Sequence, residues 1–329
     1  MNSQAIIKTF PFAGFDLHQL FFKKITVRDF EAVADTLAEY MHTQEASLIQ
    51  LFMVGPEKEQ KPWNKACMQT FGEINWPLTW INLPEKQPEC SLCVTCISGQ
   101  TVKTIIGNEF VSKIIETPDS RLGIVGAGNK PVNAGSPLAE SLVKGLLFTG
   151  CESSHLLKAW IPTRLSGSKD SPGKPSETEA ALPIAVLPFD PTYKGEIIHS
   201  LWALKTRHPE ISIQKSTKQN TYGTFHTTVI SHWESKSLML SGNFSTSENT
   251  LEQVINFLSE FLKEKGFDWN HCVRGVSYCH PAESEKALKD LFKSLKIPLA
   301  PWLFVPGPST GQESQFWFDA DLVWEKSRR

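Results

Sequence analysis

The stretch LEQVINFLSEFLKEKGFDWNHCVRGVSY (251–278) decides the fold: an amphipathic helix ends at a glycine, and a short apolar strand with one basic residue follows. LAESLVKGLLFTGCESSHLLKAWI (138–161) repeats this pattern at an offset of 116 residues. A fainter copy is VRDFEAVADTLAEYMHTQEASLIQLFMVG (27–55). Recurrence of one helix–strand pattern predicts a chain built from repeated α/β units. The offset pairs Gly150 with Gly266, His155 with His271, Leu157 with Val273, and Lys158 with Arg274.

Length, charge, apolar runs and cysteine content limit the class of protein to which the chain can belong. With 329 residues the chain is long enough for two domains. Its 33 Lys and Arg against 35 Asp and Glu give a net charge of −2, which does not favour nucleic-acid binding. The N-terminus carries Asp16 and His18 and lacks a continuous apolar core, so we expect no secretory signal. No apolar run reaches the ~18 residues of a membrane span. Seven dispersed cysteines are typical of reduced thiols, and a cytoplasmic location is expected.

Three segments begin with capping signals of a helix. The clearest helix follows Asn249, with Glu252 at the expected capping-box position, and its apolar residues from Leu251 to Leu262 recur with helical spacing. The other two starts are Thr26, with Asp29 in the first turn, and Ser136, which precedes Pro137.

The last third of the chain predicts a complete α+β unit. Two strands separated by a polar turn are followed by helix, strand, helix and two closing strands. This order, ββαβαββ, predicts one sheet with helices packed on one face. The predicted elements are strands 222–233 and 236–245, helix 250–265, strand 272–279, helix 282–296, and strands 302–305 and 316–324.

The middle third repeats this order less completely. A strand in RLGIVGAG (121–128), a helix at 137–149 and closing strands after residue 180 are expected, but the place of the second helix is taken by a Ser, Gly, Pro and Lys-rich stretch (164–179). We interpret this stretch as an exposed loop. The segment 205–221 is the best linker, so we expect an N-terminal domain over 1–210 and a C-terminal domain over 211–329. A hairpin is expected over CSLCVTCISGQTVKTIIG (90–107).

Two motifs suggest a cofactor or metal, and both have simpler interpretations. GIVGAGN (123–129) resembles a dinucleotide-binding fingerprint, but Pro131 stands where its third glycine belongs and the helix cap comes several residues later. Cys90, Cys93 and Cys96 have a metal-like spacing but lack a fourth ligand nearby, and the segment alternates like a strand. We predict no cofactor and no metal. His226 and His232 lie an even number of residues apart without a metal-binding motif.

Asp319 and Asp321 lie inside the apolar strand FWFDADLVW (316–324), and their spacing of two places them on one face. A carboxylate in a buried sheet costs free energy unless it is paired or hydrogen-bonded. Arg274, on another predicted strand, is a candidate partner. The sequence leaves open whether these are pocket carboxylates or a structural ion pair.

With this element order, the C-terminal third resembles the Rid (YjgF-type) family. The matching residues are YGTFH (222–226), LMLSGNFS (238–245), VRGVSY (273–278) and FDADLVW (318–324). The whole chain is most similar to chorismatases, which join a divergent N-terminal Rid-like half to a C-terminal one. That likeness includes LIQLFMVG (48–55), WPLTWI (76–81), the Asp119–Gly123 stretch, LLKAWI (156–161) and YGTFHTTV (222–229). The resemblance implies two tandem Rid-like, chorismate-mutase-like domains of the α+β class, the N-terminal one divergent.

The resemblance also implies a site. The family's closing-strand glutamate corresponds to Asp319, the candidate acid. Two departures concern the carboxylate-binding arginines of these families: residues 300–303 contain no arginine, and Glu313 stands near the place of the second arginine. A site that binds a dicarboxylate needs other cations in their place. The implied substrate-binding residues are Tyr222, Phe225, Gly242, Arg274, Trp302 and Glu313.

Two functions follow from these observations. The first is a divergent chorismatase-like enzyme that hydrolyses or eliminates the enolpyruvyl group of chorismate or a related small cyclic carboxylate. The second is a non-catalytic Rid-like protein that binds a small molecule or acts in an assembly. An NAD(P)-binding reductase, suggested only by GIVGAGN, is the weakest alternative. The expected partner is a small-molecule carboxylate, with no nucleic acid and no membrane, and the family resemblance leaves monomer and homotrimer open.

Overall fold

The chain folds into two compact units, and each combines β-strands with a few helices, as the expected α+β class requires. The computed structural model describes residues 5–83, 89–107, 110–127, 144–164, 184–189, 200–245, 250–279, 283–306 and 315–325. The first unit comprises Met1–Leu156 and Lys194–Pro209, and the second comprises Leu157–Tyr193 and Glu210–Arg329.

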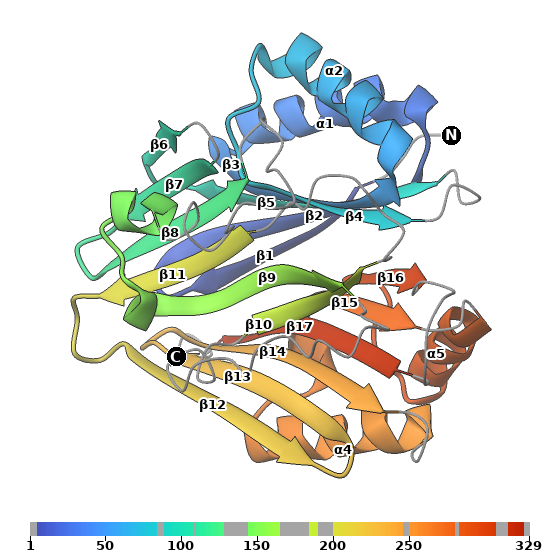
Figure 1. Cartoon of the computed structure of the whole chain (residues 1–329). Coiled ribbons are helices and arrows are strands. Elements are labelled where there is room, and N and C mark those ends of the chain that lie inside the picture. Colours follow the sequence, from blue (N-terminus) through green and yellow to red (C-terminus); the bar gives the residue numbers. More distant parts are fainter. Residues whose placement is uncertain are drawn as a thin grey trace. The chain divides into compact units, whose positions relative to one another are not determined.

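In the first unit, two helices, α1 and α2, cover one face of an extended sheet (Figure 1). Its described strands follow the order β1-β2-β5-β3-β4-β8-β11, and β7 pairs with both β6 and β8. Phe30, Leu37 and Trp63 of the helices share one buried core with sheet residues such as Leu51 and Val94. The elements are β1 (Ile6–Phe12), β2 (Phe15–Ile25), α1 (Phe30–Thr43), β3 (Ala46–Pro56), α2 (Gln60–Phe71), β4 (Leu78–Leu83), β5 (Cys90–Ser98), β6 (Val102–Ile106), β7 (Phe110–Glu116), β8 (Ser120–Ala127) and β11 (Ser200–Thr206).

The hairpin expected over residues 90–107 is wrong. Its two strands, β5 and β6, both exist, but β5 pairs with β2 and β3, while β6 pairs with β7. The reason is burial: β5 is buried on both faces and lies inside the sheet, whereas β6 is partly exposed. The predicted helix at Thr26 is confirmed, since Thr26 and Asp29 form the capping box of a short 3-10 turn that leads into α1.

The glycine motif after Arg121 does not begin a dinucleotide-binding unit. Its strand, β8, runs antiparallel to both β7 and β11. Dinucleotide-binding folds place this motif in a parallel sheet. The helix expected at 137–149 is described only from Lys144 to Phe148, where it is helical, and the capping residues Ser136 and Pro137 lie outside the described residues.

The second unit contains a six-stranded sheet in the order β12-β13-β14-β17-β15-β16. β15 and β16 are parallel, and the other neighbouring pairs are antiparallel. Helices α4 and α5 pack on one face of this sheet (Figure 1). A parallel pair, β9 and β10, also belongs to this unit from Leu157 onward, and β10 contacts β14 and β17. The elements are β9 (Leu156–Arg164), β10 (Ile184–Phe189), β12 (Ser212–Asn220), β13 (Gly223–Ser231), β14 (Ser235–Ser245), α4 (Leu251–Glu264), β15 (Cys272–Cys279), α5 (Glu283–Ser294), β16 (Trp302–Pro306) and β17 (Gln315–Glu325).

Helix α4 forms where the apolar spacing predicted it, but its cap differs by one residue. Thr250, not Asn249, is the N-cap: its side chain accepts the Gln253 N–H at 3.2 Å, and Gln253, not Glu252, completes the capping box. The apolar stripe of α4 is buried against strand residues of β13, β14 and β17, which explains why this amphipathic segment is helical.

The segment 205–221, predicted as a linker, contains a strand. β12 spans Ser212–Asn220 and pairs along its length with β13. It is an edge strand whose side chains are mostly exposed, so it lacks the apolar alternation by which a strand is recognised in a sequence.

The two best copies of the sequence repeat share their local backbone geometry. Gly150 and Gly266 have φ angles of 71° and 80°, in the left-handed region that favours glycine after a helix. A short 3-10 turn follows each glycine, at Ser153–His155 and at Trp269–His271. In each turn a histidine Nδ1 accepts the backbone N–H of an acidic residue: His155 from Glu152 at 2.9 Å and His271 from Asp268 at 3.0 Å.

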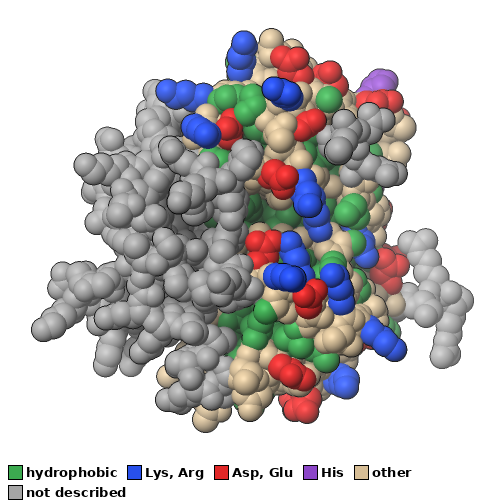
Figure 2. Space-filling view, turned by 90° about the vertical axis from the view of Figure 1, so that its right-hand side faces the viewer, with side chains coloured by type: hydrophobic (Ala, Val, Ile, Leu, Met, Phe, Trp, Pro, Cys, Tyr) green, Lys and Arg blue, Asp and Glu red, His purple; other side chains and the backbone are tan. Residues whose placement is uncertain are grey.

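Charged side chains of both signs are intermixed over the described part of the face drawn in Figure 2, in keeping with a net charge of −2. None of the helices in the described ranges is long and apolar enough to cross a membrane.

Candidate functional site

The candidate site lies on the face of the second unit's sheet that points away from α4 and α5. Along β17, Phe316, Phe318, Ala320 and Leu322 belong to the core under the helices. The residues between them therefore face the other way, and these include Asp319 and Asp321. The prediction that the two carboxylates share one face follows from this alternation.

A β-bulge brings Arg274 to the same face. Cys272 lies opposite Leu322, and regular antiparallel pairing would then place Arg274 opposite Ala320. The register instead shifts by one residue, so that Arg274 lies opposite Asp321. Bulges re-aim side chains in this way. Cys272 thus stays in the core while Arg274 reaches the carboxylates.

The predicted pairing of Arg274 with these carboxylates is confirmed. Its Nη2 donates to Asp319 Oδ2 at 2.7 Å, and its Nη1 donates to Asp321 Oδ2 at 2.6 Å. Lys158, from β9, is the second cation: its Nζ pairs with Asp319 Oδ1 and lies 2.7 Å from Asp321 Oδ1. Ser241 of β14 donates from Oγ to Asp319 Oδ1 at 3.0 Å. We call Lys158, Arg274, Asp319 and Asp321 the charge cluster.

The charge cluster is buried and electrically balanced. Lys158, Asp319 and Arg274 are 0%, 2% and 3% exposed, and only the Asp321 side chain, at 18%, has appreciable contact with solvent. Two cations and two carboxylates sum to zero. In this arrangement Asp319 accepts hydrogen bonds as a carboxylate, and it must first gain a proton before it can act as an acid.

Lys158 was not among the predicted site residues. The sequence repeat could have identified it, since the offset of 116 residues aligns Lys158 with Arg274.

Three other predicted site residues, Tyr222, Phe225 and Gly242, lie on the helix-covered face of the sheet. Phe225 is buried beside Phe257 and Phe261 of α4, and Tyr222 stacks on Phe257 with 4.8 Å between ring centroids. A Cβ on Gly242 would lie 2.8 Å from Phe225 Cβ, so Gly242 permits close packing there. The described residues therefore do not bring Tyr222, Phe225 and Gly242 together with Asp319 and Arg274, because opposite strand faces separate them.

Trp302 is also part of the core. Its side chain is 0% exposed and lies over Gly275, which leaves no ring surface for a ligand in this structure. The predicted substrate contact by Trp302 is thereby corrected to a packing contact between β16 and β15. Glu313 lies outside the described residues.

The cysteines behave as core residues. Cys90 and Cys96 belong to the apolar core, while Cys93 lies on the other face of β5 and donates from Sγ to Gln19 Oε1 at 2.8 Å. Burial raises the pKa of Cys90 and of Cys96 to about 12, which disfavours the thiolate that a metal requires. The two histidines do not pair: His226 Nδ1 lies 2.8 Å from Thr217 Oγ1, and His232 Nδ1 accepts the Glu234 N–H at 3.2 Å.

Comparisons with known proteins place the fold. No family model and no curated protein matches the sequence. Among solved structures, the chain is similar to a crystal structure of chorismatase, with a TM-score of 0.53 and 11% sequence identity. The match covers 84% of this chain and 93% of the chorismatase chain. At this low identity the likeness shows that the protein has a chorismatase-like fold.

Proposed function

We propose that this protein is a divergent chorismatase-like enzyme that hydrolyses or eliminates the enolpyruvyl group of chorismate or of a related small cyclic carboxylate. The charge cluster carries this proposal, because it sets a buried carboxylate, Asp319, between two cations on the closing strand of a chorismatase-like fold. We also propose that the C-terminal part is Rid-like, which the order of its elements from Gly223 to Glu325 supports.

The charge balance of the cluster suggests how a substrate carboxylate would bind. Arg274 and Lys158 are both engaged by Asp319 and Asp321, so an incoming carboxylate has to displace one of them. Asp321 is the more exposed of the two, and we propose that the substrate takes its place. The cluster then holds one excess negative charge if Asp321 stays nearby. An excess of negative charge favours protonation of a neighbouring carboxylate.

Protonated Asp319 would supply the acid that enolpyruvyl hydrolysis requires. The proton adds to the methylene carbon of the enol ether, and the electron pair of the double bond forms the new C–H bond. The resulting oxocarbenium carbon is attacked by water, and the hemiketal collapses to pyruvate and a ring alcohol. Lys158 and Arg274 would hold the substrate carboxylate and stabilise the Asp319 carboxylate that remains.

Pyruvate release from chorismate tests this activity directly. The wild-type chain should release pyruvate, and Asp319→Asn should slow release by ~100-fold or more, the usual contribution of a general acid. Asp290→Asn is the matched control, because Asp290 is an exposed carboxylate of α5. Far-UV circular dichroism of each variant establishes that it is folded. Wild-type release that does not exceed that of a folded Asp319→Asn variant refutes the enzymatic proposal.

Coupled proton uptake tests the displacement step separately. Calorimetric titration with chorismate in two buffers of different ionisation enthalpy should show that about one proton is taken up per ligand bound. Binding without proton uptake would argue against protonation of Asp319.

One observation favours the second candidate, a non-catalytic protein that binds a small molecule or acts in an assembly. The four charges of the cluster already satisfy one another, so the cluster is complete as a structural element. Saturable binding of a small carboxylate without pyruvate release would support this candidate over the enzyme.

A further inference from the structure

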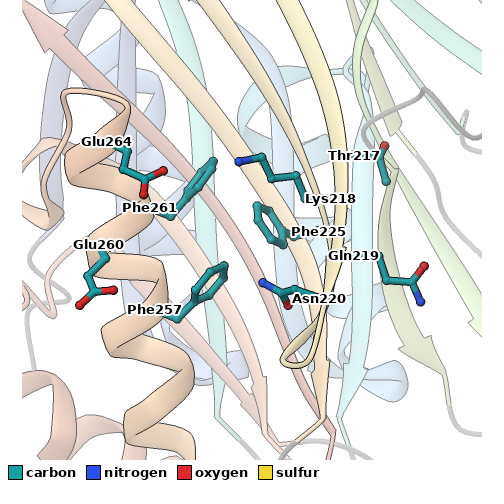
Figure 3. Close-up of a pocket in the computed structure, with 9 residues that line it drawn as sticks. All are labelled: Thr217, Lys218, Gln219, Asn220, Phe225, Phe257, Glu260, Phe261 and Glu264. Carbon is teal, nitrogen blue, oxygen red and sulfur yellow. The ribbon is translucent and has the colours of Figure 1, made fainter.

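The second unit contains an open groove between the edge strand β12 and helix α4, with a cavity volume of about 480 Å³. This lies within the ~300–1,000 Å³ of small-ligand sites. Figure 3 shows Lys218 and Asn220 pointing from β12 toward the helix, and Phe257 and Phe261 pointing from α4 toward the strand. We call this the β12–α4 groove. It lies on the helix-covered face of the sheet, opposite to the charge cluster.

Aromatic rings form the apolar part of the groove. Phe257 stacks on Tyr222 and meets Phe225 edge to face at a centroid distance of 5.6 Å. Phe225 in turn meets Phe261 edge to face at 5.1 Å. The rings thus form one continuous aromatic cluster, in which Phe225 and Phe261 are buried and Phe257 is partly exposed.

Two ammonium groups of the chain itself lie close to this aromatic cluster. The Nζ of Lys218 lies 5.1 Å from the centroid of the Phe261 ring, and the Nζ of Lys265 lies 5.7 Å from it. Both distances are within the ~6 Å range of cation–π attraction. The ring faces of the groove are therefore suited to cations.

Carboxylates of α4 add negative charge beside these rings. Glu260 and Glu264 lie one turn apart, both are exposed, and both line the groove. Within the ranges that the structure describes, neither carboxylate makes an ion pair with a lysine or arginine. Lys218 of the lining and Lys265 beside it balance the charges of the two glutamates.

We infer that the β12–α4 groove binds a small organic cation, meaning an ammonium or guanidinium group on an apolar or aromatic body. Such a cation takes the place of the Lys218 ammonium, with its charged group beside Glu260 and Glu264 and its body on Phe257. Phe257 is partly exposed, and the stacking of Tyr222 on it shows that this ring accepts an aromatic neighbour. This ligand has the opposite charge to the substrate of the proposed enzyme and binds on the other face of the sheet. Each proposal can therefore be refuted without the other.

The test uses the full-length chain and two probes of nearly equal shape, 2-phenylethylamine and the neutral 2-phenylethanol. Ligand-observed NMR titration should show saturable, millimolar or tighter binding of the amine. The alcohol should bind about fivefold more weakly or worse, since it lacks the cation–π and carboxylate interactions. Equal binding of the two probes, or no saturable binding of the amine, overturns the inference.

Variants that are expected to change the affinity for the amine in opposite directions locate its binding site. Glu260→Gln with Glu264→Gln should weaken amine binding about fivefold, whereas Lys218→Met should strengthen it by removing a competing ammonium. Glu252→Gln is the matched control, because Glu252 is an exposed glutamate at the far end of α4 and should leave the affinity unchanged. Amine binding that none of these substitutions changes places the cation elsewhere and overturns the inference. All of these residues are exposed, so the variants should fold, and pyruvate release should be unaffected.

Discussion

Lys158 and Arg274 stand 116 positions apart in the sequence and bind the same two carboxylates, Asp319 and Asp321. They occupy equivalent positions in the two best copies of the repeat, each eight residues after a glycine with positive φ. The repeat therefore supplies two cations, and both bind the carboxylates of the closing strand β17. This explains why a strand otherwise rich in apolar residues carries two carboxylates, of which Asp319 is buried and Asp321 partly exposed.

Removing one cation of the charge cluster should lower the free energy of unfolding far more than removing a surface charge. Lys158→Met leaves two carboxylates with a single cation in a buried site, and we expect the free energy of unfolding to fall by about 3–5 kcal/mol. The double variant Lys158→Met, Asp321→Asn restores the balance and should cost less than the sum of the two single changes. Urea unfolding followed by circular dichroism measures both effects.

The matched control for this prediction is Arg207→Ala. Arg207 pairs with Glu116 at 2.7 Å, but both side chains are more than 40% exposed, so the cost should be below ~1 kcal/mol. Equal costs for Lys158→Met and Arg207→Ala would contradict a structural role for the charge cluster.

Part of the charge cluster was predictable because strand geometry is periodic. The spacing of Asp319 and Asp321 predicted their common face, and Arg274 on another strand was a candidate partner because a buried carboxylate requires pairing. The contribution of Lys158 was not predicted, since the sequence does not show where β9 lies in its unit. The bulge before Arg274 was equally invisible, because a shift of register by one residue leaves no mark in the sequence.

The helices were easier to predict than the strands. The apolar stripe of α4 predicted the helix, although its cap was displaced by one residue to Thr250. β12 was missed because an exposed edge strand lacks a buried face to impose alternation. Tyr222 and Phe225 were grouped with Asp319 by family resemblance, but the face on which a strand residue lies depends on pairing register, which the sequence alone left undetermined.

A methyl group at Gly275 should disrupt the packing of β15 against β16. A Cβ there would lie 2.4 Å from the ring of Trp302, which is fully buried. We expect Gly275→Ala to lower the free energy of unfolding by about 2 kcal/mol or more, as overpacking does. Trp302→Leu should partly rescue it, since the indole Nε1 has no hydrogen-bond partner among the described residues. A Gly275→Ala variant with wild-type stability in urea would show that the ring can move aside.

Buried thiols should resist alkylation in the native protein. Cys67, Cys90 and Cys96 are buried, and burial raises the pKa of each to about 12, so very little thiolate exists at pH 8. Iodoacetamide should leave these three residues unmodified in the native chain and modify them in urea, as read by peptide mass spectrometry. Rapid native labelling of Cys90 or Cys96 would contradict their burial.

Lys113 should make stability depend on pH in the alkaline range. Its side chain is 4% exposed and its Nζ donates to Thr104 Oγ1 at 2.8 Å. Burial lowers the pKa of Lys113 from 10.5 to about 8, partly offset by attraction to Glu73. Between these values the unfolded chain holds a proton that the folded chain has lost, so the Lys113 contribution to the free energy of unfolding rises as pH increases from 8 to 10.5.

Lys113→Met should remove this rise. The free energy of unfolding of the variant minus that of wild type should therefore be greatest at pH 7 and should decline by about 3 kcal/mol by pH 10.5. The contributions of other titrating groups cancel in this difference. Urea unfolding of both proteins at pH 7, 8, 9 and 10 measures the decline. Lys103→Met is the matched control, because Lys103 is an exposed lysine on the neighbouring strand β6. A difference between Lys113→Met and wild type that does not change with pH would show that Lys113 keeps its proton in the folded protein across this range.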